Sequence, residues 1–149
     1  MVRNALMTDA KFIQDLVNSY AKDGMMLPLS INEVYENILK YFVYEEDGKV
    51  IGCCALYPSW EDLAEIRSLA VDKNLHKKGV GRILVEKCIE KAKEIGVKKI
   101  FALTYQIEFF AKLGFRVVDK NELPKKIWSD CLKCCKFPDC DETAMIKEI

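Results

Sequence analysis

The sequence predicts an α+β fold, in which a mixed, mostly antiparallel sheet is flanked by helices. Strand-like and helix-like patterns follow one another in the order β-α-α-β-β-β-α-β-α-β-β. Asp47-Gly48 is a strong hairpin signal, so the segments on either side of it are expected to pair antiparallel. A strand, a turn at Gly79, a helix and a further strand imply one parallel connection.

Seven segments are predicted as strands, because they are short, apolar and rich in β-branched residues. They are residues 2–7, 42–45, 49–57, 65–71, 98–104, 115–118 and 143–149. The third is almost entirely apolar and is expected to be central, with Cys53 and Cys54 on opposite faces as small core residues. A loop is expected at residues 58–62, which begin with Pro58.

Four segments carry the helical period, at residues 8–22, 30–41, 82–95 and 105–113. Thr8 or Asp9 is expected to cap the first, and Ser30 with Glu33 has the capping-box spacing for the second. The second helix is expected to bury Val34, Ile38, Leu39 and Tyr41. The apolar loop at residues 24–29, which contains Leu27, is interpreted either as ordinary core or as the lip of a substrate pocket.

Composition indicates a globular protein and predicts a single domain over residues 1–149. Half of the residues are hydrophobic and 31% are charged. Lys and Arg together number 23, as do Asp and Glu, so neither a nucleic-acid surface nor a membrane surface is indicated. No apolar run approaches the ~20 residues of a membrane span, and the first residues lack a signal-peptide pattern. We therefore expect a cytoplasmic protein.

The turn Lys77-Lys78-Gly79-Val80-Gly81-Arg82 precedes the long helix. Glycines allow a ligand to approach the backbone, and the first turn of a helix offers unpaired N–H groups and a partial positive charge. Together they form a cradle for phosphates. The GK[ST] ending of a P-loop and the third glycine of a dinucleotide fingerprint are absent. From the turn alone, a plain strand-to-helix connection is an equal alternative.

The segment His76-Lys77-Lys78-Gly79-Val80-Gly81 resembles the [RQ]-x-x-G-x-[GA] motif of the GCN5-related N-acetyltransferase (GNAT) superfamily, with His76 in place of the usual Arg or Gln. The resemblance implies the GNAT fold, with two splayed central strands, and acetyl-CoA as the acetyl donor. It assigns the coenzyme's pyrophosphate to His76, Lys77, Lys78, Gly79, Val80, Gly81 and Arg82. It assigns the pantetheine arm to the backbone of Leu69, Ala70 and Val71.

A narrower resemblance covers residues 50–124, and residues 3–28 more loosely. Ala64-Glu65-Ile66, Phe101-Ala102-Leu103-Thr104 and Phe109-Phe110-Ala111-Lys112-Leu113-Gly114-Phe115 are similar to the catalytic domain of N-acetylglutamate synthases. This implies a small amino-acid substrate, L-glutamate, acetylated on its α-amino group as the first step of arginine biosynthesis. The classical enzymes carry an amino-acid-kinase-like domain in front, for which 149 residues leave no room. A homodimer is left open.

The reaction needs a base, an oxyanion donor and an acid for the leaving thiolate. Glu65 is the first choice for the base, and the alternative for it is a solvated charge at the end of a strand. By resemblance, the backbone N–H of Leu69 is the oxyanion donor. Many superfamily members carry a Tyr acid where this chain has Phe110, and nearby Tyr105 is the substitute candidate.

A dicarboxylate acceptor calls for cationic partners, preferably Arg. Arg67 is the favoured one, because the period of two places it on the face of Glu65 and Leu69. Arg3 and Leu27 are further candidates for the acceptor site.

Four cysteines, Cys131, Cys134, Cys135 and Cys140, lie within ten residues. A C-x-x-C pair with further cysteines is compatible with structural zinc, which is not favoured, because metal sites usually have two well-separated pairs. A redox pair or ordinary reduced thiols are the alternatives.

Two other functions remain alternatives. One is acetylation of another amine, such as a protein N-terminus, a polyamine or a drug, although Arg67 argues against polyamines. The other is a non-catalytic acyl-CoA-binding or thiol-sensing module.

Overall fold

The computed structural model describes residues 1–123 and 142–149, with residues 76–78 described by their backbone alone. The strands are β1 (Val2–Asn4), β2 (Tyr41–Glu46), β3 (Lys49–Trp60), β4 (Leu63–Val71), β5 (Lys99–Thr104), β6 (Arg116–Val118) and β7 (Thr143–Glu148). The α-helices are α1 (Ala10–Ala21), α2 (Ile31–Glu36), α3 (Val80–Glu94) and α4 (Ile107–Lys112). Short 3₁₀ helices are η1 (Met7–Asp9), η2 (Ile38–Lys40), η3 (Lys73–Lys78) and η4 (Lys120–Glu122). The predicted order of strands and α-helices is confirmed.

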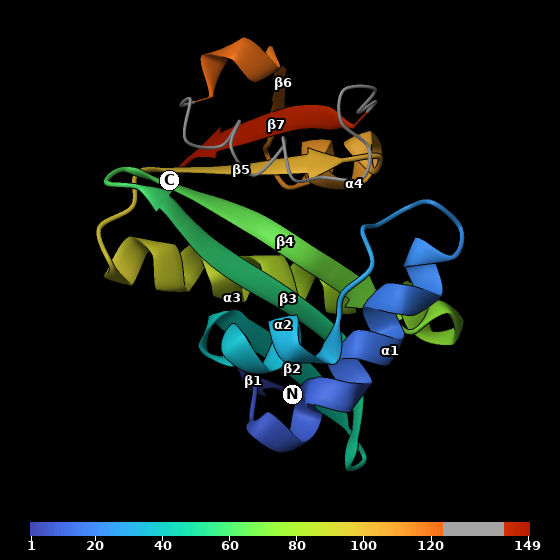
Figure 1. Ribbon diagram of the computed structural model, residues 1–149. Coiled ribbons are helices and arrows are strands. Elements are labelled where there is room, and N and C mark those ends of the chain that lie inside the picture. Colours follow the sequence, from blue (N-terminus) through green and yellow to red (C-terminus); the bar gives the residue numbers. More distant parts are fainter. Residues whose placement is uncertain (124–141) are drawn as a thin grey trace. The chain divides into compact units, whose positions relative to one another are not determined.

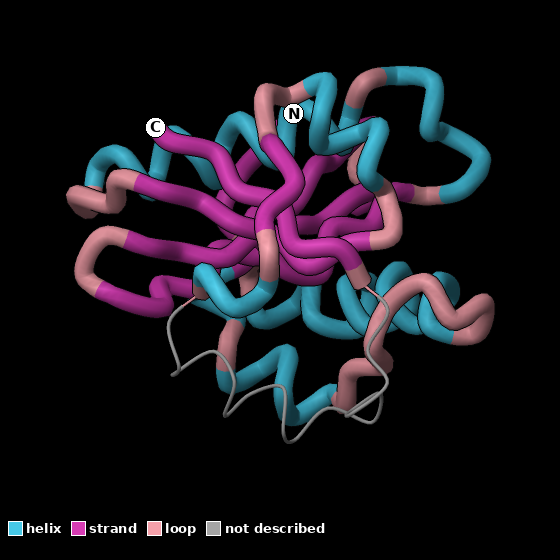
Figure 2. Tube along the Cα trace, turned by 90° about the horizontal axis from the view of Figure 1, so that it is seen from above, coloured by secondary structure: helices cyan, strands magenta, loops and turns pink. Residues whose placement is uncertain are grey.

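The seven strands form one mixed sheet in the order β1-β2-β3-β4-β5-β7-β6. β1 with β2, β2 with β3, β5 with β7 and β6 with β7 are antiparallel. β4 and β5, joined through α3, are parallel, as predicted, and their ladder pairs Leu63, Ala64 and Glu65 with Lys99, Ile100 and Phe101. Figure 2 shows the strands in magenta and the helices in cyan. The predicted fold class is confirmed.

The contacts divide the chain into two compact units. The first comprises Met1–Leu56 and Ile66–Lys91, and the second comprises Tyr57–Glu65 and Ala92–Ile149. In the first unit, α1 and α2 cover one face of β3 and β4, and α3 covers the other (Figure 1). The two cysteines of β3 lie on opposite faces, as predicted. Cys54 Sγ lies 3.6 Å from Cys88 Sγ on α3, and Cys53, the preceding residue of the strand, lies on the other face.

Gly52 explains how closely α3 approaches β3. A Cβ at this position would lie 3.0 Å from a methyl of Val80 and 3.0 Å from a methyl of Leu84. Both of these α3 residues are buried. The absence of a side chain at Gly52 therefore sets the position of the first turns of α3.

Turn and cap chemistry produced the predicted connections. Asp47 and Gly48 both have positive φ, 52° and 76°, as a type I′ hairpin requires. The Ser30 hydroxyl accepts the Glu33 amide at 3.1 Å and begins α2.

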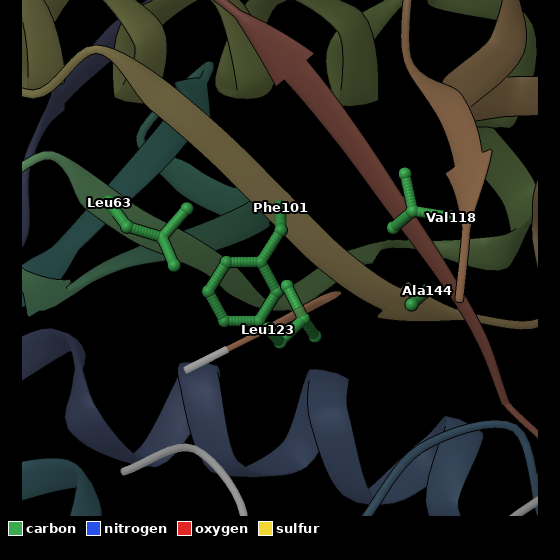
Figure 3. Packing of buried hydrophobic residues seen from close by; sticks show 5 residues of the cluster. All are labelled: Leu63, Phe101, Val118, Leu123 and Ala144. Atoms are coloured by element: carbon green, nitrogen blue, oxygen red, sulfur yellow. The ribbon is translucent and has the colours of Figure 1, made fainter. Parts of the chain in front are cut away.

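The second unit has its own hydrophobic cluster around Phe101 of β5. Figure 3 shows Leu63, Phe101, Val118, Leu123 and Ala144, which come from β4, β5, β6, the end of η4 and β7. Phe110 on α4 is also buried and packs edge-on against Phe109 and Phe115, with ring centroids 5.1 Å apart in each case.

Several local predictions are wrong. The first strand ends at Asn4 rather than at residue 7, Tyr41 begins β2 rather than ending a helix, and the side chain of Asp9 makes no capping bond to α1. Leu39 is 97% exposed rather than buried, because α2 ends at Glu36 and a 3₁₀ turn changes the side-chain period. Residues 58–60 belong to β3 rather than to a loop. Pro58 is accommodated because the ladder with β2 extends only as far as Ala55, so its missing N–H is not needed on that side. Within the described residues, no helix has both the length and the apolar character needed to cross a membrane.

Candidate active site

The predicted phosphate turn connects β4 to α3 in the first unit. η3 ends at Lys78, Gly79 follows with φ +69°, and α3 begins at Val80, two residues earlier than predicted. A Cβ at Gly79 would meet no heavy atom within 4 Å, so glycine is required there for the backbone conformation. The space around Gly79 also leaves the backbone open to a ligand.

The N-terminus of α3 supplies amide donors at this turn. Its first intrahelical bond runs from the Ile83 amide to the Gly79 carbonyl, at 3.2 Å. The amides of Val80, Gly81 and Arg82 come before it and have no carbonyl of the same helix to bind. A 15-residue helix also places its positive dipole end there. This is the geometry that binds phosphate.

The side chain of Arg82 points along the helix in this structure. Its Nε donates to Glu86 Oε1 at 2.9 Å, one turn further on, and its side chain is 70% exposed. An exposed i,i+4 pair contributes little stability, so it would exchange readily for a phosphate.

The end of β4 is fastened to α1. The Tyr20 hydroxyl donates to the Val71 carbonyl, and Lys73 Nζ binds Asp23 at 2.8 Å and the Ser19 carbonyl at 3.1 Å. Burial, and then the charge of Asp72, raise the pKa of Tyr20, so its hydroxyl stays protonated and remains a donor. These bonds hold the backbone just before the phosphate turn.

The alternation of β4 is interrupted at Ser68, which sequence reasoning missed. Ser68 has φ +55°, a left-handed conformation unusual for a residue other than glycine, Asn or Asp. Glu65 and Arg67 still lie two apart along the strand, but the period of two does not carry across Ser68 to Leu69. The period of two therefore no longer supports the prediction that Leu69 shares a face with Glu65 and Arg67.

The candidate base and acceptor residues have distinct environments. Glu65 is buried, with 6% of its surface exposed, and lies opposite Phe101 in the β4–β5 ladder. It is therefore not the solvated strand-end charge of the alternative interpretation. Arg67, Leu69 and Tyr105 are half-buried. Tyr105 stands just after β5, where the Gln106 amide binds the Thr104 hydroxyl at 2.8 Å.

Arg3 has a structural environment instead. Its guanidinium donates to both carboxylate oxygens of Asp9, at 2.7 and 3.1 Å, and to Glu45 at 3.5 Å. Burial alone would raise the pKa of Asp9, but the hydrogen bonds from Arg3 and from the Leu6 amide outweigh it and lower this pKa. Because its donors bind carboxylates of its own chain, Arg3 is not proposed as an acceptor residue.

Leu27 lies in a loop fastened to α1. Asn18 exchanges two hydrogen bonds with the backbone of Leu29, at 2.9 and 3.2 Å, and Gln14 adds a third at 3.3 Å. Leu27 itself is 39% exposed, so the core interpretation is wrong for this side chain.

Among residues 1–123 and 142–149, no three His, Cys, Asp or Glu residues are grouped to hold a metal ion. Cys131, Cys134, Cys135 and Cys140, the candidate zinc ligands, lie outside the described residues.

A model of the acetyltransferase (GNAT) family matches residues 11–115. The protein belongs to the GNAT family. It is 44% identical to an uncharacterized N-acetyltransferase, CT2212, of Chlorobaculum tepidum over 99% of this chain and 96% of that one. An amino-acid acetyltransferase of Mycobacterium tuberculosis is 32% identical over 87% of this chain and 76% of its own length. The chain spans only 28% of the amino-acid acetyltransferase of Aeromonas salmonicida, at 33% identity.

Two solved structures match all or nearly all of the chain. N-acetylglutamate synthase from Neisseria gonorrhoeae, complexed with coenzyme A and N-acetyl-glutamate, has a TM-score of 0.91 and 28% identity over 99% of this chain and 34% of that one. Rv2747 from Mycobacterium tuberculosis, in complex with CoA, has a TM-score of 0.89 and 27% identity over 100% of this chain and 99% of that one. This GNAT protein is therefore an acetyltransferase.

Proposed function

We propose that the protein transfers the acetyl group of acetyl-CoA to the α-amino group of L-glutamate. The observation that carries this proposal is the match over nearly the whole chain to a synthase complexed with coenzyme A and N-acetyl-glutamate. The amino-acid acetyltransferase of Mycobacterium tuberculosis, similar over 87% of this chain, supports the same substrate class. The proposed acceptor is an amino acid, as in the name of that acetyltransferase. We propose arginine biosynthesis as the pathway and the cytoplasm as the compartment.

The coenzyme's pyrophosphate is assigned to the backbone from Gly79 to Arg82 at the start of α3. The open space around Gly79 and the amides of the first helical turn fit a phosphate group. The sequence also assigns three residues just before Gly79 to this site, His76, Lys77 and Lys78. Lysine and histidine are residue types that can donate hydrogen bonds to a phosphate. The pantetheine arm follows the backbone of Leu69, Ala70 and Val71.

Catalysis is assigned to residues of β4 and the turn after β5. The acceptor amine is mostly protonated near pH 7, so it must lose a proton before it attacks the thioester carbon. Glu65, directly or through a water, takes that proton, and the Leu69 amide stabilises the oxyanion that forms. Tyr105 donates a proton to the departing thiolate, since Phe110 cannot. Arg67 binds an acceptor carboxylate.

The test is a thiol-release assay with acetyl-CoA against the standard amino acids, a peptide with a free N-terminus, and spermidine. We expect release with L-glutamate well above every other acceptor. Release with the peptide or with spermidine alone would assign a different amine. Binding of acetyl-CoA in calorimetry without turnover of any acceptor would support an acyl-CoA-binding module.

A further inference from the structure

Ser68 is held in its left-handed conformation by two buried side chains of neighbouring strands. The Tyr41 hydroxyl of β2 donates to Ser68 Oγ at 3.3 Å, and the Cys53 thiol of β3 donates to the Ser68 carbonyl oxygen at 3.3 Å. Tyr41 is 1% exposed and Cys53 is fully buried. Cys53 pairs with Val43, two residues from Tyr41, so the two side chains lie on the same face of the sheet.

The hydrogen bond from the Cys53 thiol fixes the orientation of the peptide group between Ser68 and Leu69. The Ser68 carbonyl and the Leu69 amide belong to one planar trans peptide, so they point in opposite directions. Cys53 holds the carbonyl toward β3, and the Leu69 N–H is consequently directed away from β3.

We propose that Cys53 is a positioning residue for catalysis, whose thiol aims the Leu69 amide at the thioester carbonyl by holding the Ser68 carbonyl. This inference rests on the proposed function, because it takes the Leu69 amide as the oxyanion donor. Cys53 itself touches neither substrate, and its contribution passes through one peptide group.

The adjacent Cys54 provides a matched control. It is equally buried and on the same strand, but it faces Cys88 and α3 rather than Ser68. Replacing either cysteine with alanine removes one buried sulfur from the first unit. Only the Cys53→Ala change removes the bond to the Ser68 carbonyl.

The experiment compares the native protein with Cys53→Ala, Cys53→Ser and Cys54→Ala, using acetyl-CoA labelled with ¹³C at the thioester carbonyl. Infrared difference spectra of the complexes report hydrogen bonding to that carbonyl. We expect a lowered stretching frequency in the native complex, a return toward the free value in Cys53→Ala, and a native-like value in Cys53→Ser and Cys54→Ala.

Kinetics with L-glutamate provide the second measurement. Loss of an oxyanion donor usually lowers kcat by 10²–10³, so a misdirected donor should lower it about tenfold in Cys53→Ala. The KM for acetyl-CoA should change little, and Cys53→Ser should recover most of kcat because it keeps a donor. If Cys53→Ala does not fold, the nearly isosteric pair Cys53→Thr and Cys53→Val makes the same comparison of a donor with no donor.

A native frequency and a kcat within twofold of native in Cys53→Ala would overturn the proposal. So would equal losses in Cys53→Ala and Cys54→Ala, which indicate general packing. A native protein that turns over but leaves the carbonyl frequency unshifted would remove Leu69 as the donor and Cys53 with it, while acetyl transfer stands. A native protein that does not bind acetyl-CoA would instead contradict the proposed function.

Discussion

Replacing Gly52 with alanine should weaken both folding and coenzyme binding. The new Cβ would lie 3.0 Å from methyls of Val80 and Leu84, whereas ordinary contact begins at 3.4 Å, so each methyl must retreat by about 0.4 Å. Leu84 can rotate its terminal methyl, but Val80 is stiff at χ1, so α3 itself must shift. The shift falls on the helical turn that carries the proposed phosphate donors.

The magnitude follows from two opposing terms. Overpacking a filled core costs about 1–3 kcal/mol, and a glycine-to-alanine change recovers about 0.5–1 kcal/mol through the unfolded chain. We expect a net loss of about 1–2 kcal/mol in the free energy of unfolding, measured by urea denaturation. Displaced amides should raise the Kd for CoA about three- to tenfold in calorimetry, which corresponds to about 0.7–1.4 kcal/mol.

A double-mutant cycle with Leu84→Ala is the control for this prediction. Leu84 is fully buried, so its truncation opens a cavity that the methyl of Gly52→Ala partly fills. The second change should therefore cost about 1 kcal/mol less in the Leu84→Ala background than in the native one. Strict additivity, or native stability and native CoA affinity in Gly52→Ala, would refute the packing argument.

Four further outcomes are expected. Arg67→Ala should raise the KM for L-glutamate far more than the KM for acetyl-CoA, and equal effects on both would remove Arg67 from the acceptor site. Glu65→Gln should lower kcat about 10²–10⁴-fold without loss of CoA binding; a native pH–rate profile in this variant would show that another base acts. Asp9→Asn should cost about 2 kcal/mol at pH 7 by leaving Arg3 with a neutral partner. The folded-state pKa of Asp9 is lowered, so its carboxylate stabilises the fold at pH values above the unfolded pKa of about 4. This stabilisation is lost as the pH falls through the folded-state pKa. Denaturation curves of the native protein and of Asp9→Asn should therefore converge in acid. Ser68→Gly should keep the fold, whereas Ser68→Val should lose about 2 kcal/mol or more in thermal unfolding, since a β-branched residue is strained at φ +55°; equal stability of these two variants would show that the left-handed conformation is not retained.

Features that depend on local chemistry could be predicted from the sequence. The Asp47-Gly48 turn and the Ser30 cap rest on the conformations that these residues adopt most easily, and the structure has both. The parallel pairing of β4 with β5 followed from the strand–helix–strand order around Gly79. These patterns were sufficient for the order of the elements along the chain and for the parallel pair, but they do not predict that β7 lies between β5 and β6.

Features that depend on distant partners could not be predicted. Ser68 is an ordinary strand residue by sequence, and its left-handed backbone is stabilised by Tyr41 and Cys53 from two other strands. By sequence Arg3 is a candidate for the acceptor site, but in the fold its guanidinium pairs with Asp9. Helix ends also shift when a 3₁₀ turn follows, which is why Leu39 is exposed although it was predicted to be buried.

Chemical labelling of the three buried thiols of the first unit would detect local unfolding of that unit. Cys53, Cys54 and Cys88 have no exposed surface, and burial raises the pKa of Cys53 to about 12, so little thiolate is present and an alkylating reagent cannot reach it while the unit is closed. Each labelling event at these positions would therefore record a structural opening, as amide exchange does for a backbone group. Mass spectrometry of tryptic peptides, with and without coenzyme, would then measure how strongly a bound ligand suppresses these openings.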